Sequence, residues 1–388
     1  MMLFFINLPF AGFCRMVGID MSKFEDCNIN DDLKADLERI GFVEMTAVQE
    51  QAMSPALDGK DLIIRSKTGS GKTAAYLVPI LNMIGRGRKP RALVVLPTRE
   101  LAIQVNGVAE RLGRRSRIRS TVIYGGSSMS RQIESLEKGT DIIVGTPGRI
   151  LDLHDRGFLD LSAIRYFVLD EADVMLDMGF IDDIRKIMSF LNEEKQTFIL
   201  SATMPEEIVE MASDFMHDPT TIMVDSDEVT VKEIDHYYTI TKRNRKLQAL
   251  QNYLKTYGPQ KTIIFSRTKA GTKMVCDFLL NKGYNAVMIN GDMSQSQREK
   301  AMYLFRNRVE YLVATNVAAR GIDIRDVTDI INFDLPDDPK VYVHRVGRTA
   351  RLGSDGRAFS IVEENQKDAV RQIERMARVS LRQIRMQD

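Results

Sequence analysis

The 388 residues are enough for about two domains of ordinary size. The apolar share of 44% and the charged share of 28% are those of a globular protein, and the net charge of +1 excludes a globally basic nucleic-acid binder, so any such site must be local. Cys14, Cys27 and Cys276 lie too far apart to form a metal-type pair, which favours reduced thiols in a cytoplasmic protein.

The first twenty residues are apolar but do not have the pattern of a targeting segment. They lack the basic start of a signal peptide, and the run is too short, and too broken by Pro9 and Gly12, to span a bilayer. Met16 and Met21 are alternative starts. We therefore expect residues 1–20 to be an unstructured extension rather than a membrane anchor, and we expect no membrane partner.

Two expected helices, one ending at Gly41 and one at Leu57, lead to a glycine-rich stretch at residues 66–73 with the sequence SKTGSGKT. An apolar run at 61–64 precedes this stretch, and a helical pattern at 74–83 follows it. Strand, glycine-rich loop and helix are the context of a phosphate-binding loop, in which backbone N–H groups and the helix N-terminus favour phosphate. Lys72 can then reach the outer phosphates, and the Thr73 hydroxyl can ligate Mg²⁺.

The strands expected after this loop all end in small or polar residues. In a parallel α/β sheet such ends lie along one edge, where ligands bind. The repeated alternation of strand and helix predicts right-handed crossovers and a sheet covered on both faces. The strand runs and the residues after them are 91–96 with Pro97, Thr98 and Arg99; 120–124 with Gly125 and Gly126; 141–144 with Thr146, Pro147, Gly148 and Arg149; 166–169 with Asp170 to Asp173; and 197–200 with Ser201, Ala202 and Thr203.

The acidic pair after the fourth of these strands completes a catalytic pattern. Asp170 is placed to hold Mg²⁺ opposite Thr73, and Glu171 to orient or deprotonate an attacking water. Either motif alone is a weak signal, because glycine-rich loops and Asp-Glu pairs are common on surfaces. Together, in this order and in these contexts, they predict a site that hydrolyses a nucleoside triphosphate.

The pattern lapses at residues 225–234, where the sequence is acidic and unperiodic, and we place the domain boundary there. The expected domains are 21–224, with the phosphate loop, and 235–388, joined by the linker 225–234. Strands are expected at 262–265, 286–289, 311–314 and 330–333 in the second domain. This half has no phosphate loop, so it is not a second independent NTPase.

Arginines at positions 345, 348 and 351 are spaced by three residues in the second half, and the segment 319–323 places a cation, a glycine and a carboxylate in one turn. Residues at i and i+3 share a helix face, and guanidinium groups match phosphoryl oxygens. Arginine clusters are most often solvated surface. In a chain with a single phosphate site, an arginine finger supplied across a cleft is the sharper interpretation.

This set of motifs, in this order over about residues 24–356, resembles the DEAD-box ATP-dependent RNA helicases of superfamily 2. The run Asp170-Glu171-Ala172-Asp173 gives that family its name. The resemblance implies two tandem RecA-like α/β domains, each a mostly parallel sheet covered by helices on both faces. It also implies a monomer that uses ATP and Mg²⁺, and that works on RNA with possible ribonucleoprotein or accessory partners.

The resemblance also implies roles for the residues that match the family's motifs. For ATP they are Phe24, Phe42, Thr46, Gln49, Ser66, Lys67, Thr68, Gly69, Ser70, Gly71, Lys72, Thr73, Gly321, Asp323, Arg348 and Arg351. For catalysis they are Lys72, Asp170, Glu171, His344, Arg348 and Arg351, with Thr73 and Asp170 at the metal. For RNA they are Pro97, Thr98, Arg99, Gly125, Gly126, Thr146, Pro147, Gly148, Arg149, Thr268, Gln295, Arg298 and Thr315. For coupling between domains they are Asp173, Ser201, Thr203, Asn316, Arg320 and Arg345.

The implied mechanism is an ATP-driven clamp. ATP and RNA together close the cleft between the domains, and the bound strand is bent in a way that a duplex cannot follow. A few base pairs therefore open, and hydrolysis through Glu171 and a water resets the clamp. Contacts to the RNA backbone would not read sequence, whereas contacts to 2′-hydroxyls would distinguish RNA from DNA.

Five positions depart from the family pattern. Met45 and Ala47 stand where prolines are usual, Ser66 replaces an alanine, and Asn290 replaces a common histidine. Asn316 replaces an aspartate and removes a negative charge, which bears on the coupling of RNA binding to ATP hydrolysis.

The C-terminal stretch has a basic, helical pattern. We expect an amphipathic helix that docks on the second domain with a solvated basic face; the alternative is additional RNA affinity through phosphates. The arginines are Arg371, Arg375, Arg378, Arg382 and Arg385, and the apolar residues are Ile373, Met376, Ala377, Leu381 and Ile384.

Three functions remain open at this point. The first is an RNA-dependent ATPase that unwinds short duplexes or remodels ribonucleoprotein. The second is an ATP-gated RNA clamp, whose unwinding is incidental. The third is a DNA helicase or translocase of the same superfamily, against which the adenine-reading loop argues.

Overall fold

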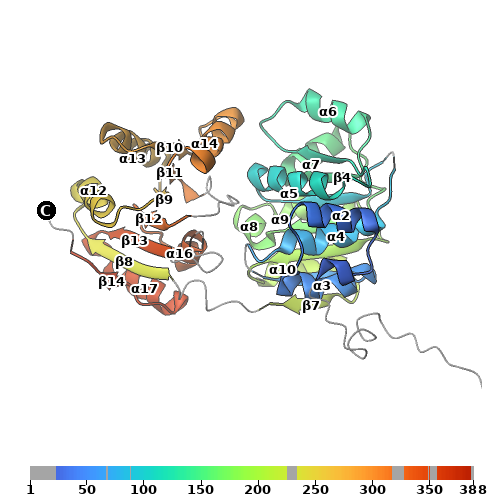
Figure 1. Cartoon of the computed structure of the whole chain (residues 1–388), viewed down its shortest axis with the longest axis horizontal. Coiled ribbons are helices and arrows are strands. Elements are labelled where there is room, and N and C mark those ends of the chain that lie inside the picture. Colours follow the sequence, from blue (N-terminus) through green and yellow to red (C-terminus); the bar gives the residue numbers. More distant parts are fainter. Residues whose placement is uncertain are drawn as a thin grey trace, which may run out of the picture. The chain divides into compact units, whose positions relative to one another are not determined.

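The computed structural model describes residues 23–66, 69–87, 89–224, 234–316, 327–347, 349 and 356–385. The chain divides into two compact units, Met1–Asp225 and Ser226–Asp388 (Figure 1). Each unit contains one sheet of seven parallel strands, which confirms the predicted fold class. The strand order is β3-β4-β2-β5-β6-β1-β7 in the first unit and β10-β11-β9-β12-β13-β8-β14 in the second.

The first unit alternates strands and helices, as the sequence predicts. Its expected strands agree with the structure to within one or two residues, and β7 at the sheet edge was not predicted. The strands are β1 (Leu62–Arg65), β2 (Ala92–Val95), β3 (Ser120–Ile123), β4 (Ile142–Gly145), β5 (Tyr166–Asp170), β6 (Gln196–Ser201) and β7 (Thr220–Met223). The helices are η1 (Phe24–Asp26), α2 (Asp31–Arg39), α3 (Ala47–Leu57), α4 (Lys72–Met83), α5 (Arg99–Leu112), α6 (Met129–Glu137), α7 (Pro147–Asp155), α8 (Ala172–Asp177), α9 (Ile181–Ser189) and α10 (Glu206–Phe215).

Alternate residues of each strand point to opposite faces, so this sheet has two cores. Leu62 and Ile64 of β1 pack with α2, α3, α4 and α5 on one face. Leu93 and Val95 of β2 pack with α7, α8, α9 and α10 on the other. A sheet covered on both faces presents its polar groups at the strand ends, and the candidate site lies at the carboxyl ends.

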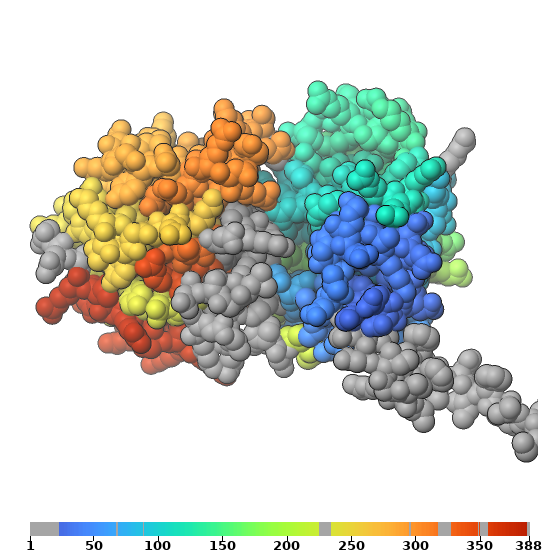
Figure 2. Space-filling model, viewed as in Figure 1, coloured from blue at the N-terminus to red at the C-terminus, as the bar shows by residue number. Residues whose placement is uncertain are grey.

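Helix α4, which follows the phosphate loop, is buried over most of its length because α2 and α3 pack over it. In Figure 2 the blue segment that contains α2 and α3 lies at the surface of this unit. The sequence of α4 is apolar on nearly all sides, which suits a helix enclosed between a sheet and other helices. The phosphate loop is therefore attached to a rigid element.

The second unit repeats the architecture. β8, β13 and β14 were not predicted, and β8 begins at Ile234, the last residue of the expected linker. The other linker residues, 225–233, lie outside the described residues. The strands are β8 (Ile234–Ile240), β9 (Thr262–Phe265), β10 (Ala286–Ile289), β11 (Tyr311–Ala314), β12 (Asp329–Asn332), β13 (Gly356–Val362) and β14 (Arg382–Gln383). The helices are η2 (Arg243–Arg245), α12 (Lys246–Tyr257), α13 (Lys269–Asn281), α14 (Gln295–Asn307), α16 (Pro339–Val346), η3 (Glu364–Gln366) and α17 (Lys367–Ala377).

The two faces of this sheet are also covered. One core joins the strands to α14, α16 and α17, and the other joins them to α12 and α13. Cys27 and Cys276 are buried free thiols, and burial raises the pKa of each to about 11. Among the described helices, none is both long and apolar enough to cross a bilayer.

The expected C-terminal helix is shorter than predicted. It ends at Ala377, because Arg378 takes a left-handed conformation with φ 52° and the chain then pairs with β8 as β14. Arg382 and Arg385 therefore do not lie on the helix. Leu381 is buried in the same core as Val370 and Ile373 of α17, so the helix and the segment after it both pack on the second unit.

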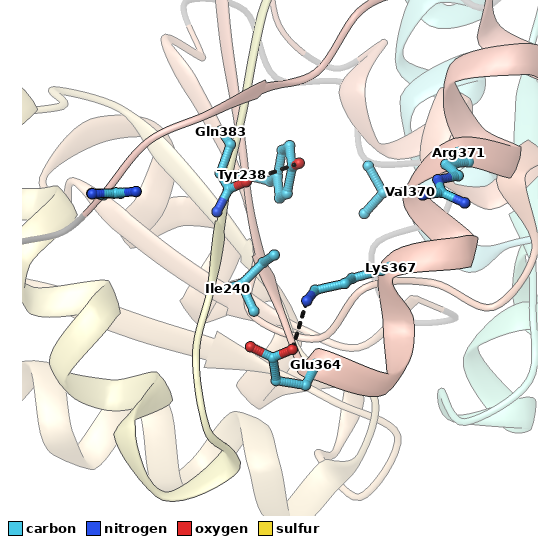
Figure 3. Close-up of a pocket in the computed structure, with 8 residues that line it drawn as sticks. Tyr238, Ile240, Glu364, Lys367, Val370, Arg371 and Gln383 are labelled. Carbon is cyan, nitrogen blue, oxygen red and sulfur yellow. Dashed lines mark hydrogen bonds and ion pairs between the residues drawn. The ribbon is translucent and has the colours of Figure 1, made fainter.

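A groove of about 470 Å³ lies between this C-terminal segment and β8 (Figure 3). Lys367 points toward Glu364 and pairs with it at 2.7 Å, and Arg371 pairs with Asp368 at 3.5 Å. β14 is at the opposite sheet edge from β10. Lys367 and Arg371 are exposed, as a solvated basic face requires, and additional RNA affinity through this surface stays a prediction. The lining residues are Tyr238, Ile240, Glu364, Lys367, Val370, Arg371, Gln383 and Arg385.

Candidate active site

The phosphate loop leaves β1 and enters α4 through a tightly bonded turn. The backbone N–H of Ser66 donates to the Ser201 carbonyl at 3.0 Å, and the Ser66 hydroxyl donates to Ser70 Oγ at 2.6 Å. Lys72 is only 6% exposed, and its Nζ donates to the Ser66 carbonyl at 2.7 Å. The ammonium group is thus held inside the loop, where phosphates would bind. Of the predicted loop residues, Lys67 and Thr68 lie outside the described residues.

Gln49 connects the expected adenine-reading loop to the phosphate loop. Its Oε1 accepts from the Thr46 backbone N–H at 2.9 Å, and its Nε2 donates to the Gly71 carbonyl at 3.0 Å. Gly71 has φ 94°, and a Cβ there would lie 2.5 Å from Gln49 Nε2, so only glycine fits. The loop is therefore anchored by Gln49 although Met45 and Ala47 replace the usual prolines.

Phe24 does not match its expected place at the nucleotide. It is 2% exposed because its ring packs into the core with α2, and it stacks on Phe42 with ring centroids 6.4 Å apart. Phe42 is half-buried and keeps an accessible part. In this conformation Phe24 supports Phe42 and cannot offer a face to a base.

Asp170 and Glu171 sit at a direct junction between β5 and α8. Asp170 Oδ1 accepts from the Glu171 backbone N–H at 2.9 Å, and its Oδ2 accepts from the Tyr76 hydroxyl at 3.2 Å. Glu171 has φ 59° and ψ 48°, a left-handed conformation that costs a residue with a side chain about 1–2 kcal/mol. Such strain at a buried acidic residue is typical of a functional site.

Burial dominates the electrostatics of Asp170. It raises the pKa of this carboxyl to about 6, the Lys72 ammonium opposes the rise, and the neighbouring Glu171 carboxylate adds to it. Oxygen donors suit Mg²⁺, which binds one or two protein groups together with phosphates and waters. The oxygen donors of Thr73 and Asp170 are therefore a set that fits Mg²⁺.

Ser201, at the end of β6, joins the phosphate loop to the acidic segment, since β6 lies between β1 and β5. Besides the bond to Ser66, its hydroxyl accepts from the Asp173 backbone N–H at 3.2 Å. The Asp173 carboxylate in turn accepts from the backbone N–H and the hydroxyl of Thr203 at 2.9 and 3.0 Å. The structure thus brings together the predicted residues Asp173, Ser201 and Thr203 within the first unit.

Three of the predicted RNA segments meet at the carboxyl ends of the neighbouring strands β2, β3 and β4. The Arg99 guanidinium lies against Gly126, where a Cβ would be 2.5 Å from its Nη1. The Thr98 hydroxyl caps the N-terminus of α5, and Thr146 directly precedes the N-terminus of α7; helix N-termini favour phosphate. Arg149 donates through Nη1 to Gln132 Oε1 at 3.1 Å. The segments 97–99, 125–126 and 146–149 therefore form one surface.

Sequence reasoning missed Gln132. Its side chain also donates to the Tyr124 carbonyl at 3.0 Å and to the Ser127 hydroxyl, so it ties Arg149 to the loop of Gly125 and Gly126. It lies within α6, outside every motif, and no local pattern marks it.

The predicted RNA residues of the second unit lie at the ends of neighbouring strands. Thr268 caps α13, and its hydroxyl accepts from the Gly271 backbone N–H at 3.0 Å. Thr315 follows β11, while Gln295 and Arg298 lie on α14, which follows β10; only the backbone of Gln295 is described. Because β10, β11 and β9 are adjacent, these positions lie together at the carboxyl ends of the three strands.

Arg345 is a buried cation at the centre of the second unit, 5% exposed and over the Phe265 ring at 4.8 Å. Its Nε donates to Asn316 Oδ1 at 2.6 Å, and its Nη1 donates to Asn332 Oδ1 at 2.8 Å and to the Asp334 carbonyl at 2.9 Å. These are neutral oxygens, and burial lowers the pKa of Arg345 to about 10. In this unit Asn316 and Arg345 bond to each other.

Replacing Asn316 with aspartate should stabilise the protein, because a carboxylate would then face the Arg345 guanidinium. The present bond has a charge on the guanidinium alone, and a second charge on its partner would turn it into an ion pair worth about 1 kcal/mol more, so thermal unfolding of the variant should shift up by about 2–4 °C. Asn290→Asp is the matched control, since the Asn290 amide donates to Thr272 Oγ1 and the neighbouring Asp292 backbone N–H is its other partner. That variant should lose stability. Equal shifts in both would contradict the assignment.

Several predicted residues lie outside the described residues, namely Lys67, Thr68, Arg320, Gly321, Asp323, Arg348 and Arg351. The arginine finger and the ribose contact that depend on them stay predictions. His344 is described and lies half-buried on α16, next to Arg345.

Comparison with known proteins matches residues 46–211 to the DEAD/DEAH box helicase family and residues 245–353 to the helicase conserved C-terminal domain. The DEAD-box ATP-dependent RNA helicase CshA of Geobacillus kaustophilus is 42% identical over 357 residues, 92% of this chain and 76% of that protein. CshA of Bacillus subtilis is 42% identical over 353 residues, 90% and 72% of the two chains. The solved structure of S. cerevisiae Dbp5 bound to RNA and ADP BeF3 is 31% identical, with a TM-score of 0.84 over 94% of this chain and 95% of that one.

Proposed function

This chain belongs to the DEAD-box family of ATP-dependent RNA helicases, and on that basis we propose that it closes on RNA with ATP and opens short duplexes or remodels ribonucleoprotein. The observation that carries the proposal is the bonded connection from the phosphate loop through Ser201 to Asp173 and Thr203. The nucleotide site and the residues assigned to coupling thus form one hydrogen-bonded unit.

In the proposed hydrolysis, Lys72 neutralises charge on the outer phosphates of ATP. Thr73 and Asp170 would hold Mg²⁺, which supplies further charge neutralisation when bound. Glu171 orients the attacking water and accepts its proton. The buried positions of Lys72, Asp170 and Glu171 exclude bulk water, which strengthens these electrostatic interactions.

RNA is proposed to bind along the edge formed by residues 97–99, 125–126 and 146–149, and along the matching edge of the second unit. Arg99, Arg149 and the N-termini of α5 and α7 supply positive potential for phosphates, although the whole chain has a net charge of only +1. Such contacts fix the strand without reading its sequence. Dbp5, a relative by structure, is bound to RNA.

The proposed cycle rests on differential affinity. ATP and RNA drive closure only if both bind the closed form more tightly than the open form. In the closed form Arg348 and Arg351 are assigned to the γ-phosphate and Asp323 to the ribose, by their match to the family's motifs. Loss of the γ-phosphate removes those contacts and lets the clamp reopen. We also propose that the protein acts as a monomer in the cytoplasm, where Cys27 and Cys276 stay reduced.

The test is steady-state ATP hydrolysis by the whole chain, alone, with single-stranded RNA, and with DNA of matched sequence. Strong stimulation by RNA alone supports the proposal. Equal stimulation by DNA contradicts RNA preference and would favour a DNA translocase. If neither RNA nor DNA stimulated hydrolysis, and RNA complexes formed in ATP were long-lived, the results would favour a clamp that holds RNA without unwinding it.

A further inference from the structure

Tyr76 is a fully buried tyrosine on α4 that no motif accounts for. Its ring packs in the core between the sheet and the overlying helices, a place that phenylalanine would fill equally well. A buried hydroxyl costs stability unless it is hydrogen-bonded. The hydroxyl therefore needs a partner, and the partner it has, Asp170, lies at the proposed metal site.

The Tyr76 hydroxyl contacts one of the two side chains assigned to the metal. It donates to Asp170 Oδ2 at 3.2 Å, across 94 residues of sequence. Thr73 lies three residues earlier on α4, on the same face of the helix as Tyr76. One rigid aromatic side chain thus connects the helix that carries Thr73 to the strand that carries Asp170.

The second oxygen of Asp170 is held as well, since Oδ1 accepts from the Glu171 backbone N–H at 2.9 Å. Donors from two different elements therefore set the orientation of this carboxylate. A carboxylate has about four acceptor positions, so two remain for metal-bound waters. Ligating carboxylates are commonly oriented by such bonds, and loss of one typically costs 10–100-fold in metal affinity.

We infer that Tyr76 is a positioning residue for Mg²⁺, whose hydroxyl ties the Asp170 carboxylate to α4, the helix that carries Thr73, in the geometry that binds the Mg²⁺–nucleotide. The inference rests on the proposed function, because it assigns Mg²⁺ to these two residues. It differs from a purely structural role in one respect. A structural hydroxyl would change stability alone, whereas a positioning hydroxyl changes how strongly Mg²⁺ enhances nucleotide binding.

The test is Tyr76→Phe in the whole chain, with a fluorescent ATP analogue titrated in EDTA and in saturating Mg²⁺. The readout is the dissociation constant in EDTA divided by that in Mg²⁺. This ratio should fall about tenfold in the variant, because binding in Mg²⁺ weakens while binding in EDTA is unchanged. Tyr253→Phe is the matched control, since Tyr253 is also fully buried and its hydroxyl donates to Asp329 Oδ1 at 2.7 Å in the second unit.

Thermal unfolding in EDTA measures how much stability each substitution removes from the fold. Both variants should unfold at a lower temperature than the parent, and only Tyr76→Phe should change the Mg²⁺ ratio. A Tyr76→Phe ratio equal to that of the parent would overturn the inference and leave the nucleotide site intact. A parent protein whose nucleotide binding does not respond to Mg²⁺ would overturn both the inference and the proposed ATP site.

Discussion

Glu171→Gln is expected to lower kcat for RNA-stimulated ATP hydrolysis by about 10²–10⁴-fold while ATP binding is retained. The amide keeps the size and most of the hydrogen bonding of the side chain but cannot accept the proton of the attacking water. The left-handed backbone conformation at position 171 costs glutamate and glutamine the same strain energy, so the fold should be unaffected. Single-turnover hydrolysis and equilibrium binding of an ATP analogue separate the two effects.

The control for this variant is Glu207→Gln, which removes an exposed carboxylate in the first turn of α10. Its kcat should equal that of the parent. If Glu171→Gln retained more than about a tenth of the parent rate, Glu171 would not be the base, and proton transfer would have to be assigned to another group.

Asp170→Asn is expected to abolish Mg²⁺-dependent hydrolysis and yet to raise the free energy of unfolding in EDTA. Burial raises the pKa of Asp170 from its ordinary value to about 6, so the charged form is penalised in the folded protein. The penalty is fully present above pH 6, shrinks as the pH falls, and disappears only well below the ordinary pKa of about 4, where the carboxyl is protonated in the folded and unfolded states alike. Asparagine carries no charge and avoids it.

The expected gain is therefore up to about 3 kcal/mol at pH 7.5 and about half of that at pH 5. Denaturant unfolding of both proteins at the two pH values, without nucleotide and in EDTA, measures it. Asp36→Asn is the control, because Asp36 is buried against Arg39 at 3.1 Å and a neutral residue there should lose stability. A gain that does not shrink at pH 5 would refute the electrostatic explanation.

Much of the fold follows from local patterns. The strands that end in Pro97, Gly125, Thr146 and Ser201 were predicted because an apolar run followed by small or polar residues is encoded within a few positions. Parallel pairing then puts those ends on one edge. The error at the C-terminus has the opposite origin. Residues 378–384 have a helical spacing of charges, but their structure is decided by the open edge of β8, about 140 residues away.

The sequence by itself therefore determined the strand–loop–helix units, the phosphate loop and the acidic junction at Asp170, because each depends on neighbours along the chain. Only the tertiary structure decided how they are joined. Tyr76 meets Asp170, Gln132 meets Arg149, and Asn316 meets Arg345 through hydrogen bonds between elements distant in sequence. A single hydroxyl or amide leaves no periodic signal, so these partners become visible only when packing brings them to hydrogen-bonding distance.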